Sequence, residues 1–160
     1  MEGIGIQAHF GSDLPGPEQL LKVVDQFAGF GLPIEMTECS FNLQDRQLQA
    51  DYLRDFSIAM FSHPAVQDII LWGFWSRRHW RPDAALYGDD WTPRPLAQEW
   101  IDLTQKQWST DVTTSSAVNG GADVRGFFGT YEVTVSFGGK SKTVTARLQP
   151  GGTSVAVKLE

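Results

Sequence analysis

Short apolar runs alternate with segments of helical period through the first two thirds of the chain, and this alternation restricts its fold. Three strands and three helices are expected, in the order strand 4–9, helix 17–30, strand 33–37, helix 44–61, strand 68–75 and helix 96–104. Strands that alternate with helices form right-handed parallel βαβ units. Three strands are too few to close a sheet, so we expect an open α/β arrangement. The strand at 68–75 is apolar enough to be covered on both faces.

The chain changes character near Trp108, after which threonine, serine, valine and glycine dominate. Apolar residues then alternate with polar ones in three stretches, which are 131–137, 144–148 and 155–159. Paired glycines at 138–139 and 151–152 mark the turns between these stretches. The pattern predicts a small antiparallel β meander of three to four strands. We therefore expect two domains, residues 1–107 and residues 108–160.

The composition excludes several classes of protein. With 160 residues, 41% of them hydrophobic and 20% charged, the chain is globular in character rather than disordered or collagen-like. A formal net charge of −6 without a basic run makes nucleic acids and anionic membranes poor partners. The longest apolar stretch, 69–75, is too short to span a bilayer, and a single cysteine, Cys39, excludes an intrachain disulfide. No signal peptide is visible ahead of the first expected strand.

Polar side chains stand at the ends of the expected strands, where α/β proteins gather their ligand-binding groups. Gln7 and His9 are two residues apart, so both are expected on the same face of the first strand. Glu38 follows Met36 at the same spacing and is expected on the face that Met36 occupies. A carboxylate that ends an apolar strand is costly unless it is hydrogen-bonded or protonated.

Two tryptophans complete this set, with Trp72 in the third strand and Trp80 in the loop that follows. Each residue alone has a plainer explanation: the amide and imidazole as a satisfied core pair, the carboxylate as a helix cap or salt-bridge partner, the indoles as core packing. Together they predict one polar and aromatic pocket. Such a pocket suits a sugar, because its apolar face stacks on indole while its hydroxyls bond to amide, imidazole and carboxylate.

Four runs of the sequence, taken in order, look like the carboxyl-terminal part of glycoside hydrolase family 10. They are GIGIQAHF, GLPIEMTECS, SHPAVQDIILWGFWSRRHWRPDAALYGDDWTPRP and AQEWIDL, and they cover most of residues 3–108. That family consists of retaining endo-β-1,4-xylanases and their relatives on a TIM barrel. The resemblance implies a partial TIM barrel, strands six to eight with their helices. The run RGFFGTYEVTV also resembles a small β appendage that follows the barrel in some members.

The resemblance implies roles for individual residues. Glu38 matches the catalytic nucleophile, and His9 matches the histidine that hydrogen-bonds to it. Gln7 matches a glutamine of the glycone-side subsite, which Trp72 and Trp80 would line. Four further residues of the strand-eight loop would lie where they can touch sugar hydroxyls: Trp75, Arg77, Arg78 and His79. The implied reaction needs no metal or other cofactor.

Three departures from the family pattern bear on activity. Ser40 stands where the family usually has an aspartate bonded to the histidine, and Ser76 replaces an acidic residue common in the strand-eight loop. The family's acid/base belongs to an asparagine-glutamate pair on strand four, and this sequence contains no such pair. Because retaining hydrolysis needs two carboxyl groups, the chain is expected to carry the nucleophile without the acid/base.

The expected function is that of the carboxyl-terminal portion of a retaining endo-β-1,4-xylanase-like hydrolase, inactive as an isolated chain. Its partner would be a β-1,4-linked polysaccharide or oligosaccharide of the xylan type. A piece of a barrel exposes two strand edges, so we also expect association with itself or with the missing barrel half. The alternative is a non-catalytic sugar-binding or structural fragment. By family resemblance, the parent protein is expected to be secreted or periplasmic.

Overall fold

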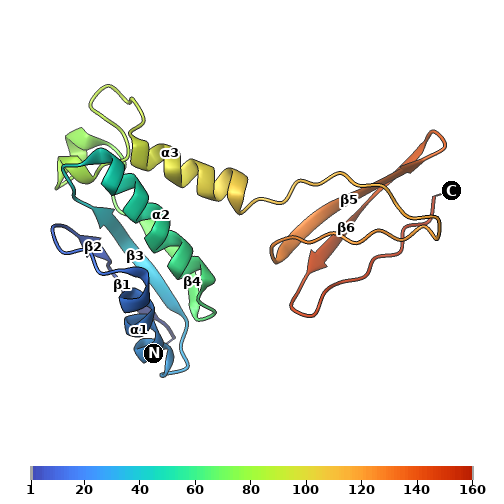
Figure 1. The fold of residues 1–160 in the computed structure, drawn as a ribbon, viewed down its shortest axis with the longest axis horizontal. Helices are drawn as coiled ribbons and strands as arrows, with labels where there is room; N and C mark the ends of the chain where they lie inside the picture. The colour runs from blue at the N-terminus through green and yellow to red at the C-terminus, as the bar shows by residue number, and fades with distance from the viewer. Residues whose placement is uncertain (1, 160) are drawn as a thin grey trace. The chain divides into compact units, whose positions relative to one another are not determined.

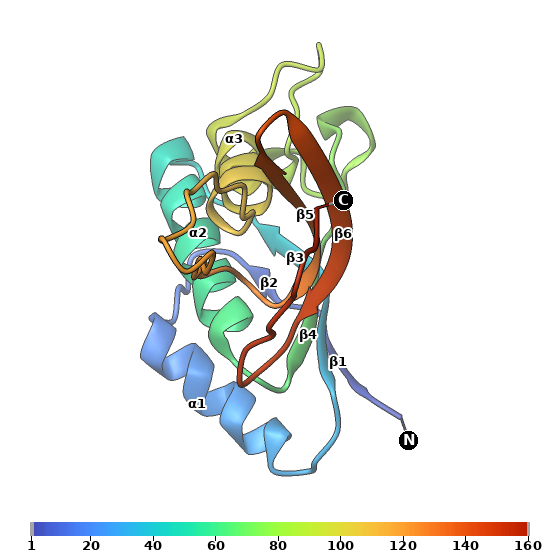
Figure 2. The same cartoon turned by 90° about the vertical axis from the view of Figure 1, so that its right-hand side faces the viewer.

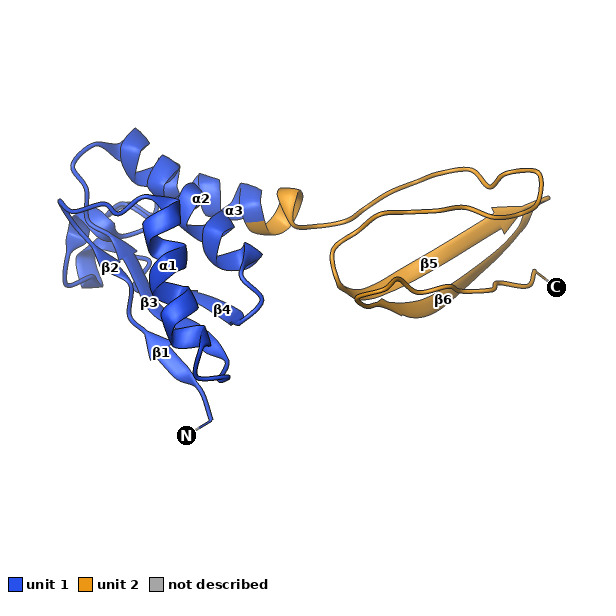
Figure 3. Cartoon of the chain, turned by 60° about the horizontal axis from the view of Figure 1, so that its bottom comes forward, with its two compact units in different colours: residues 1–103 blue, residues 104–160 orange. Residues whose placement is uncertain are grey.

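The computed structural model describes residues 2–159. The chain divides into two compact units, residues 1–103 and residues 104–160 (Figure 3). The first unit contains a parallel sheet with its helices, and the second contains a β-hairpin. Within residues 2–159, no helix is long and apolar enough to cross a bilayer.

The first unit is an open sheet with helices packed against it (Figures 1 and 2). Its elements are β1 (Ile4–Ile6), β2 (His9–Phe10), α1 (Pro17–Ala28), β3 (Ile34–Phe41), α2 (Arg46–Ser62), β4 (Val66–Leu71), two 3-10 turns (Ser76–Arg78 and Pro82–Ala84) and α3 (Pro95–Asp102). The strand β3 is central: β1 and β2 run parallel to it on one side, and β4 runs parallel to it on the other. Helix α2 packs on β3 and β4 and contacts both α1 and α3.

The core of this unit lies between β3 and α2. Asp45 starts α2 by accepting hydrogen bonds from two backbone N–H groups of the first turn. On the sheet side, Phe10 stacks on Phe41 with ring centroids 5.7 Å apart, and Phe56 of α2 meets both rings edge-on. The largest side chains that are less than 2% exposed include Phe41, Phe56, Ile34, Met36, Leu53, Met60, Leu96 and Leu103.

The three expected strands are present, with changes that matter for the site. The first is interrupted, because Ala8 adopts a left-handed conformation (φ 58°) between β1 and β2. The second runs four residues beyond its expected end, to Phe41. The third ends at Leu71 and is not covered on both faces, since Ile70 is 49% exposed. That expectation was wrong because apolar composition alone does not place a second layer over the strand: Gln67, Asp68 and Ile70 of β4 are all exposed.

The second unit contains one hairpin in place of the meander of three to four strands. Strands β5 (Gly129–Phe137) and β6 (Lys140–Leu148) pair antiparallel through a two-glycine turn in which both φ values are positive. The alternating stretch 155–159 forms no strand. It is linked to β6 by a side-chain contact, with Lys142 donating to the backbone carbonyl of Lys158, instead of by a backbone ladder. That residues 108–160 fold as a domain of their own remains a prediction.

The packing of α2 gives a stability prediction. Leu53→Ala removes a fully buried side chain (0% exposed) and leaves a cavity, so it should lower the free energy of unfolding by about 2–5 kcal/mol. Leu48→Ala, on the same helix but 46% exposed, should cost less than about 1 kcal/mol. Urea denaturation followed by circular dichroism measures both. Equal losses in the two variants would contradict the described core.

The thiol of Cys39 reports on the burial of β3. Desolvation raises its pKa to about 12 and it is 2% exposed, so about 1 thiol in 10,000 is ionised at pH 8. Ellman's reagent at pH 8 should therefore label the native chain slowly and the urea-unfolded chain at once. Rapid stoichiometric labelling of the native chain would show that β3 is not packed as described.

Candidate active site

The residues singled out at the strand ends line one open cleft of about 630 Å³. The cleft lies at the carboxyl ends of the parallel strands, and its lining comprises Gln7, His9, Glu38, Trp72, Gly73, Arg78, His79 and Trp80. The structure therefore brings together all five residues named as catalytic or substrate-binding. Gly73, and Arg78 and His79 from the loop that follows β4, also line the cleft.

The Glu38 carboxylate has one partner for each oxygen. The Gln7 amide donates to Oε1 over 3.3 Å, and His9 Nε2 lies 3.3 Å from Oε2. The Glu38 side chain is 27% exposed and that of His9 is 20% exposed. The carboxylate is thus fixed in orientation while it remains reachable from the cleft.

A β-bulge in β3 aims Glu38 into the cleft. Between Met36 and Cys39, β3 advances three residues while β4 advances two, from Ile69 to Leu71. Met36 and Cys39, on either side of the irregularity, are both at most 2% exposed. The expectation that Glu38 shares the face of Met36 was wrong, because regular alternation fails where a strand contains an extra residue.

The break at Ala8 brings Gln7 and His9 to the same carboxylate. Its left-handed backbone ends β1 and restarts pairing at His9, which lies opposite Ser40 in β3. The Ala8 carbonyl accepts a hydrogen bond from the Ser40 N–H over 3.2 Å. The pair therefore meets Glu38 from an interrupted strand, whereas the sequence pattern predicted a continuous one.

Ser40 is the second partner of the His9 ring. Its hydroxyl is 2.8 Å from His9 Nδ1, and the residue is 2% exposed. A neutral imidazole that donates from Nε2 to Glu38 can accept the Ser40 O–H at Nδ1, so both contacts are satisfied without a second carboxylate. The departure at Ser40 therefore leaves a complete hydrogen-bonded chain from Ser40 through His9 to Glu38.

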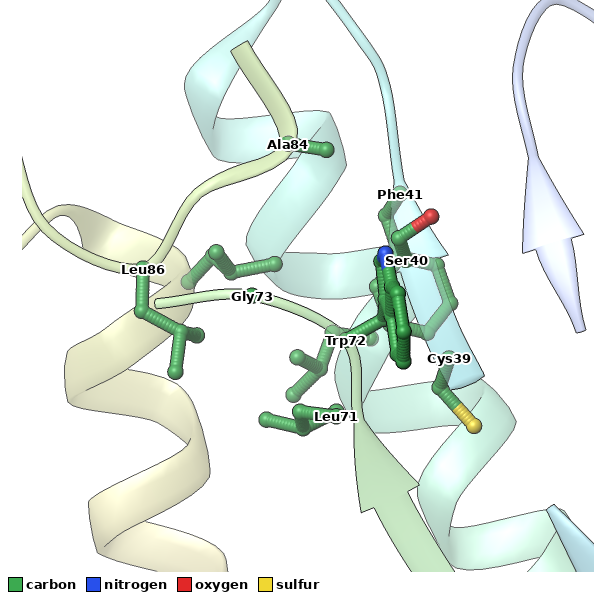
Figure 4. Close-up of a pocket in the computed structure, with 10 residues that line it drawn as sticks. Cys39, Ser40, Phe41, Leu71, Trp72, Gly73, Ala84 and Leu86 are labelled. Carbon is green, nitrogen blue, oxygen red and sulfur yellow. The ribbon is translucent and has the colours of Figure 1, made fainter. Parts of the chain in front are cut away.

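The two tryptophans present exposed indoles at the cleft. Trp72 is 45% exposed and Trp80 is 55% exposed. The Trp80 ring meets the His9 ring edge-on at 5.3 Å, and the Arg81 guanidinium lies 4.2 Å from the Trp80 centroid. The interior behind Trp72 has no room for a water molecule, and Figure 4 shows the Trp72 indole beside Ser40 above this packed region. One side of that indole is thereby supported.

The other candidate residues of the loop that follows β4 lie either outside the cleft or within it. Trp75 stacks on Trp91 with centroids 5.1 Å apart, and Arg77 lies 3.5 Å from the Asp89 carboxylate, so neither lines the cleft. The Ser76 hydroxyl donates to that same carboxylate. Within the cleft, His79 uses both ring nitrogens on backbone groups, which leaves neither for a sugar hydroxyl.

The number of carboxylates in the cleft limits what the arrangement can do chemically. Glu38 is the single carboxylate among the residues that line the cleft, and retaining hydrolysis uses two carboxyl groups about 5–5.5 Å apart. Residues 2–159 contain no group of three or more side chains suited to hold a metal ion. The cleft by itself presents two exposed indoles and one carboxylate.

The chain is similar to known proteins both as a family and as individual sequences. The family model for glycosyl hydrolase family 10 matches residues 1–103. The anti-sigma-I factor RsgI6 of Acetivibrio thermocellus is 37% identical over 89% of this chain, which covers 19% of that protein. Endo-1,4-beta-xylanase 2 of Arabidopsis thaliana is 30% identical over 83% of this chain, which covers 12% of it. The chain thus spans less than a fifth of these relatives.

Several xylanases are among the solved structures of similar fold. Xylanase 10B from Thermotoga petrophila, crystallised with xylobiose, superimposes on 66% of this chain with a TM-score of 0.59 and 23% identity, and 37% of that enzyme is covered. The native xylanase 10B from Thermotoga maritima gives the same TM-score of 0.59. Likeness at this identity shows a shared fold, of which the open sheet here is a part. Through residues 1–103, therefore, the chain belongs to glycosyl hydrolase family 10.

Proposed function

We propose that the chain is the carboxyl-terminal part of a retaining β-1,4-xylanase-like glycoside hydrolase and that Glu38 is its nucleophile. One observation carries this proposal: the Glu38 carboxylate, held by Gln7 and His9, lies in an open cleft lined by two exposed indoles. A buried salt bridge or helix cap would not leave the carboxylate facing a cleft of this size.

The chemistry follows from that position. One Glu38 oxygen attacks the anomeric carbon and forms a glycosyl ester, while the glycosidic oxygen leaves with a proton from a second carboxyl group. Water then attacks the ester, that second group removes its proton, and the Glu38 carboxylate is released. The second carboxyl group must come from outside the residues that line this cleft. His9 and Gln7 act by holding Glu38 in line with the bond that breaks.

The substrate class is set by the shape and polarity of the cleft. Exposed indoles at Trp72 and Trp80 offer flat apolar surfaces for pyranose rings, and Gln7 and Arg78 offer donors for hydroxyl groups. Two similar enzymes were crystallised with xylobiose and with xylohexaose. Both considerations support a xylan-type β-1,4-linked chain as the ligand.

Binding without turnover is the second candidate function for the isolated chain. It is favoured by the presence of only one carboxylate in the cleft lining. The similar region of RsgI6 belongs to a protein named as an anti-sigma factor, which is consistent with uses of this module other than polymer degradation.

Activity tests the nucleophile. In a chimera in which residues 1–103 replace the matched part of Thermotoga petrophila xylanase 10B, xylan hydrolysis should depend on Glu38. Glu38→Ala should lower kcat roughly 10⁴-fold or more, and added azide should restore bond cleavage with inverted configuration, because the small anion fills the space of the missing carboxylate.

The 160-residue chain alone should show no turnover of xylan but should bind xylohexaose, with a change in tryptophan fluorescence. Glu35→Ala is the matched control in the chimera, because Glu35 lies on the same strand and does not line the cleft. A Glu38→Ala chimera that is folded by circular dichroism and hydrolyses xylan at the parent rate would refute the assignment.

We further infer that additional βα units cover the open edges of the sheet. Among residues 2–159 no strand pairs with the outer edge of β1 or of β4. Apolar side chains are exposed on β4 and in the turn after α1, with Ile70 at 49% and Phe30 at 71%. Unpaired edges with exposed apolar residues promote association.

Light scattering tests this inference on the isolated chain. The mean mass should rise with concentration, and Ile70→Lys should reduce the rise because a lysine at a sheet edge opposes pairing. Ile58→Lys, at a position of α2 with 43% exposure, should change little. A monomer at all concentrations that binds no dye for exposed apolar surface would contradict the inference.

A further inference from the structure

His79 joins the two segments that carry the cleft tryptophans. Its Nε2 lies 2.7 Å from the Trp72 carbonyl oxygen, and its Nδ1 lies 2.9 Å from the backbone N–H of Arg81. Trp72 belongs to the first segment, and Trp80 directly precedes Arg81 in the second. His79 is 7% exposed, so these two contacts are the hydrogen bonds that its ring nitrogens make in place of water.

The partners of the ring fix its chemical state. The Arg81 N–H can only donate, so Nδ1 must accept and carries no proton. The Trp72 carbonyl can only accept, so Nε2 must carry the proton. The ring is therefore held as the neutral Nε2–H tautomer, and we call these two hydrogen bonds the His79 bridge.

The close approach of Gly73 to the ring makes the bridge specific. Gly73 has a left-handed backbone (φ 74°), and a Cβ built on it would lie 2.3 Å from His79 Cδ2. Only glycine satisfies both the conformation and the contact. The chain after Trp72 thus turns around the imidazole, which fills the space between the two tryptophan-bearing segments.

We propose that His79 is a positioning residue that sets the spacing of Trp72 and Trp80, and so the width of the sugar cleft. The identity of the ligand rests on the proposed function, but the bridge itself does not. Because both ring nitrogens are engaged with backbone groups, His79 acts through the tryptophans and makes no hydrogen bond of its own to a sugar.

The bridge has a consequence at acid pH. Protonation would place an N–H at Nδ1 against the Arg81 N–H, two donors facing each other, and that half of the bridge would open. Burial lowers the pKa of His79 below its ordinary value of 6.5, against the opposing effect of the hydrogen bond to Trp72. The titratable and charged groups that face the ring are His9, Arg94 and Arg81; the two guanidinium cations lower the His79 pKa further, and a protonated His9 would act in the same direction.

The sign of the pH effect follows from this direction. The folded chain holds the neutral ring more strongly than the unfolded chain does, so the contribution of the bridge is complete above the ordinary histidine pKa. It decreases as the pH falls and is lost below the lowered pKa. Loss of the bridge should therefore loosen the tryptophans before the fold as a whole is lost.

Three variants of the full 160-residue chain test the proposal. His79→Ala removes the bridge and should weaken binding of xylohexaose roughly tenfold, with a changed near-ultraviolet circular dichroism signal of tryptophan. His79→Gln keeps one acceptor and one donor on a carboxamide that does not titrate, so it should bind xylohexaose nearly as the parent does and lose the acid sensitivity. His63→Ala is the matched control, because His63 also accepts a backbone N–H at Nδ1 and contacts Asp25 through Nε2, outside the cleft.

Nitrogen NMR of the imidazole rings separates this proposal from the proposed function. The His79 resonances should show the Nε2–H tautomer and a titration midpoint below 6.5, whether or not any sugar binds. If the parent chain binds no xylohexaose, the proposed ligand is wrong while the NMR and dichroism results still decide the bridge. The proposal is overturned if His79 shows the Nδ1–H tautomer, or if His79→Ala leaves the tryptophan dichroism as in the parent.

Discussion

The site depends on β3 being paired on both sides. Parallel pairing with β1 and β2 on one edge and with β4 on the other brings together Glu38 within β3, His9 at the start of β2 and Trp72 directly after β4. Two local irregularities orient the side chains. The bulge after Met36 turns the Glu38 carboxylate into the cleft, and the left-handed backbone of Ala8 turns Gln7 and His9 toward that carboxylate. The buried aromatic layer beneath β3 holds this geometry in place.

The Glu38 carboxylate of the cleft is held in one orientation and is also accessible. Two neutral or weakly basic donors orient Glu38 without enclosing it, and Ser40 satisfies the far side of the His9 ring without adding a charge. The tryptophans are arranged by a separate device, the imidazole of His79, which contacts backbone on both of its nitrogens. Two separate sets of hydrogen bonds therefore organise the site: one set orients the Glu38 carboxylate, and the other connects the segments that carry Trp72 and Trp80.

The order of strands and helices could be predicted from the sequence, because hydrophobic periodicity and turn residues depend only on neighbouring positions. The sequence also predicted the five residues that meet in the cleft, since strand ends converge in any parallel sheet. It could not predict the face of Glu38, because a bulge is invisible to alternation, nor the hairpin in place of a meander, because pairing of 155–159 depends on a partner edge. The sequence placed His79 in the loop after the third strand, but its contacts with two backbone groups are visible only in the structure. The available sequence signal was Gly73, a glycine directly after Trp72 and shortly before His79, which is typical of a close approach between backbone and side chain.

Trapping the glycosyl-enzyme tests the assignment of the nucleophile most directly. A 2-deoxy-2-fluoro xylobioside with a dinitrophenolate leaving group needs no acid catalyst, so it suits a chain whose cleft contains one carboxylate. After incubation and proteolysis, mass spectrometry should find one 2-deoxy-2-fluoroxylobiosyl adduct, on the peptide that contains Glu38, as an ester to that side chain with dinitrophenolate released. An adduct on another carboxylate, with Glu38 unmodified, would contradict the role assigned to Glu38.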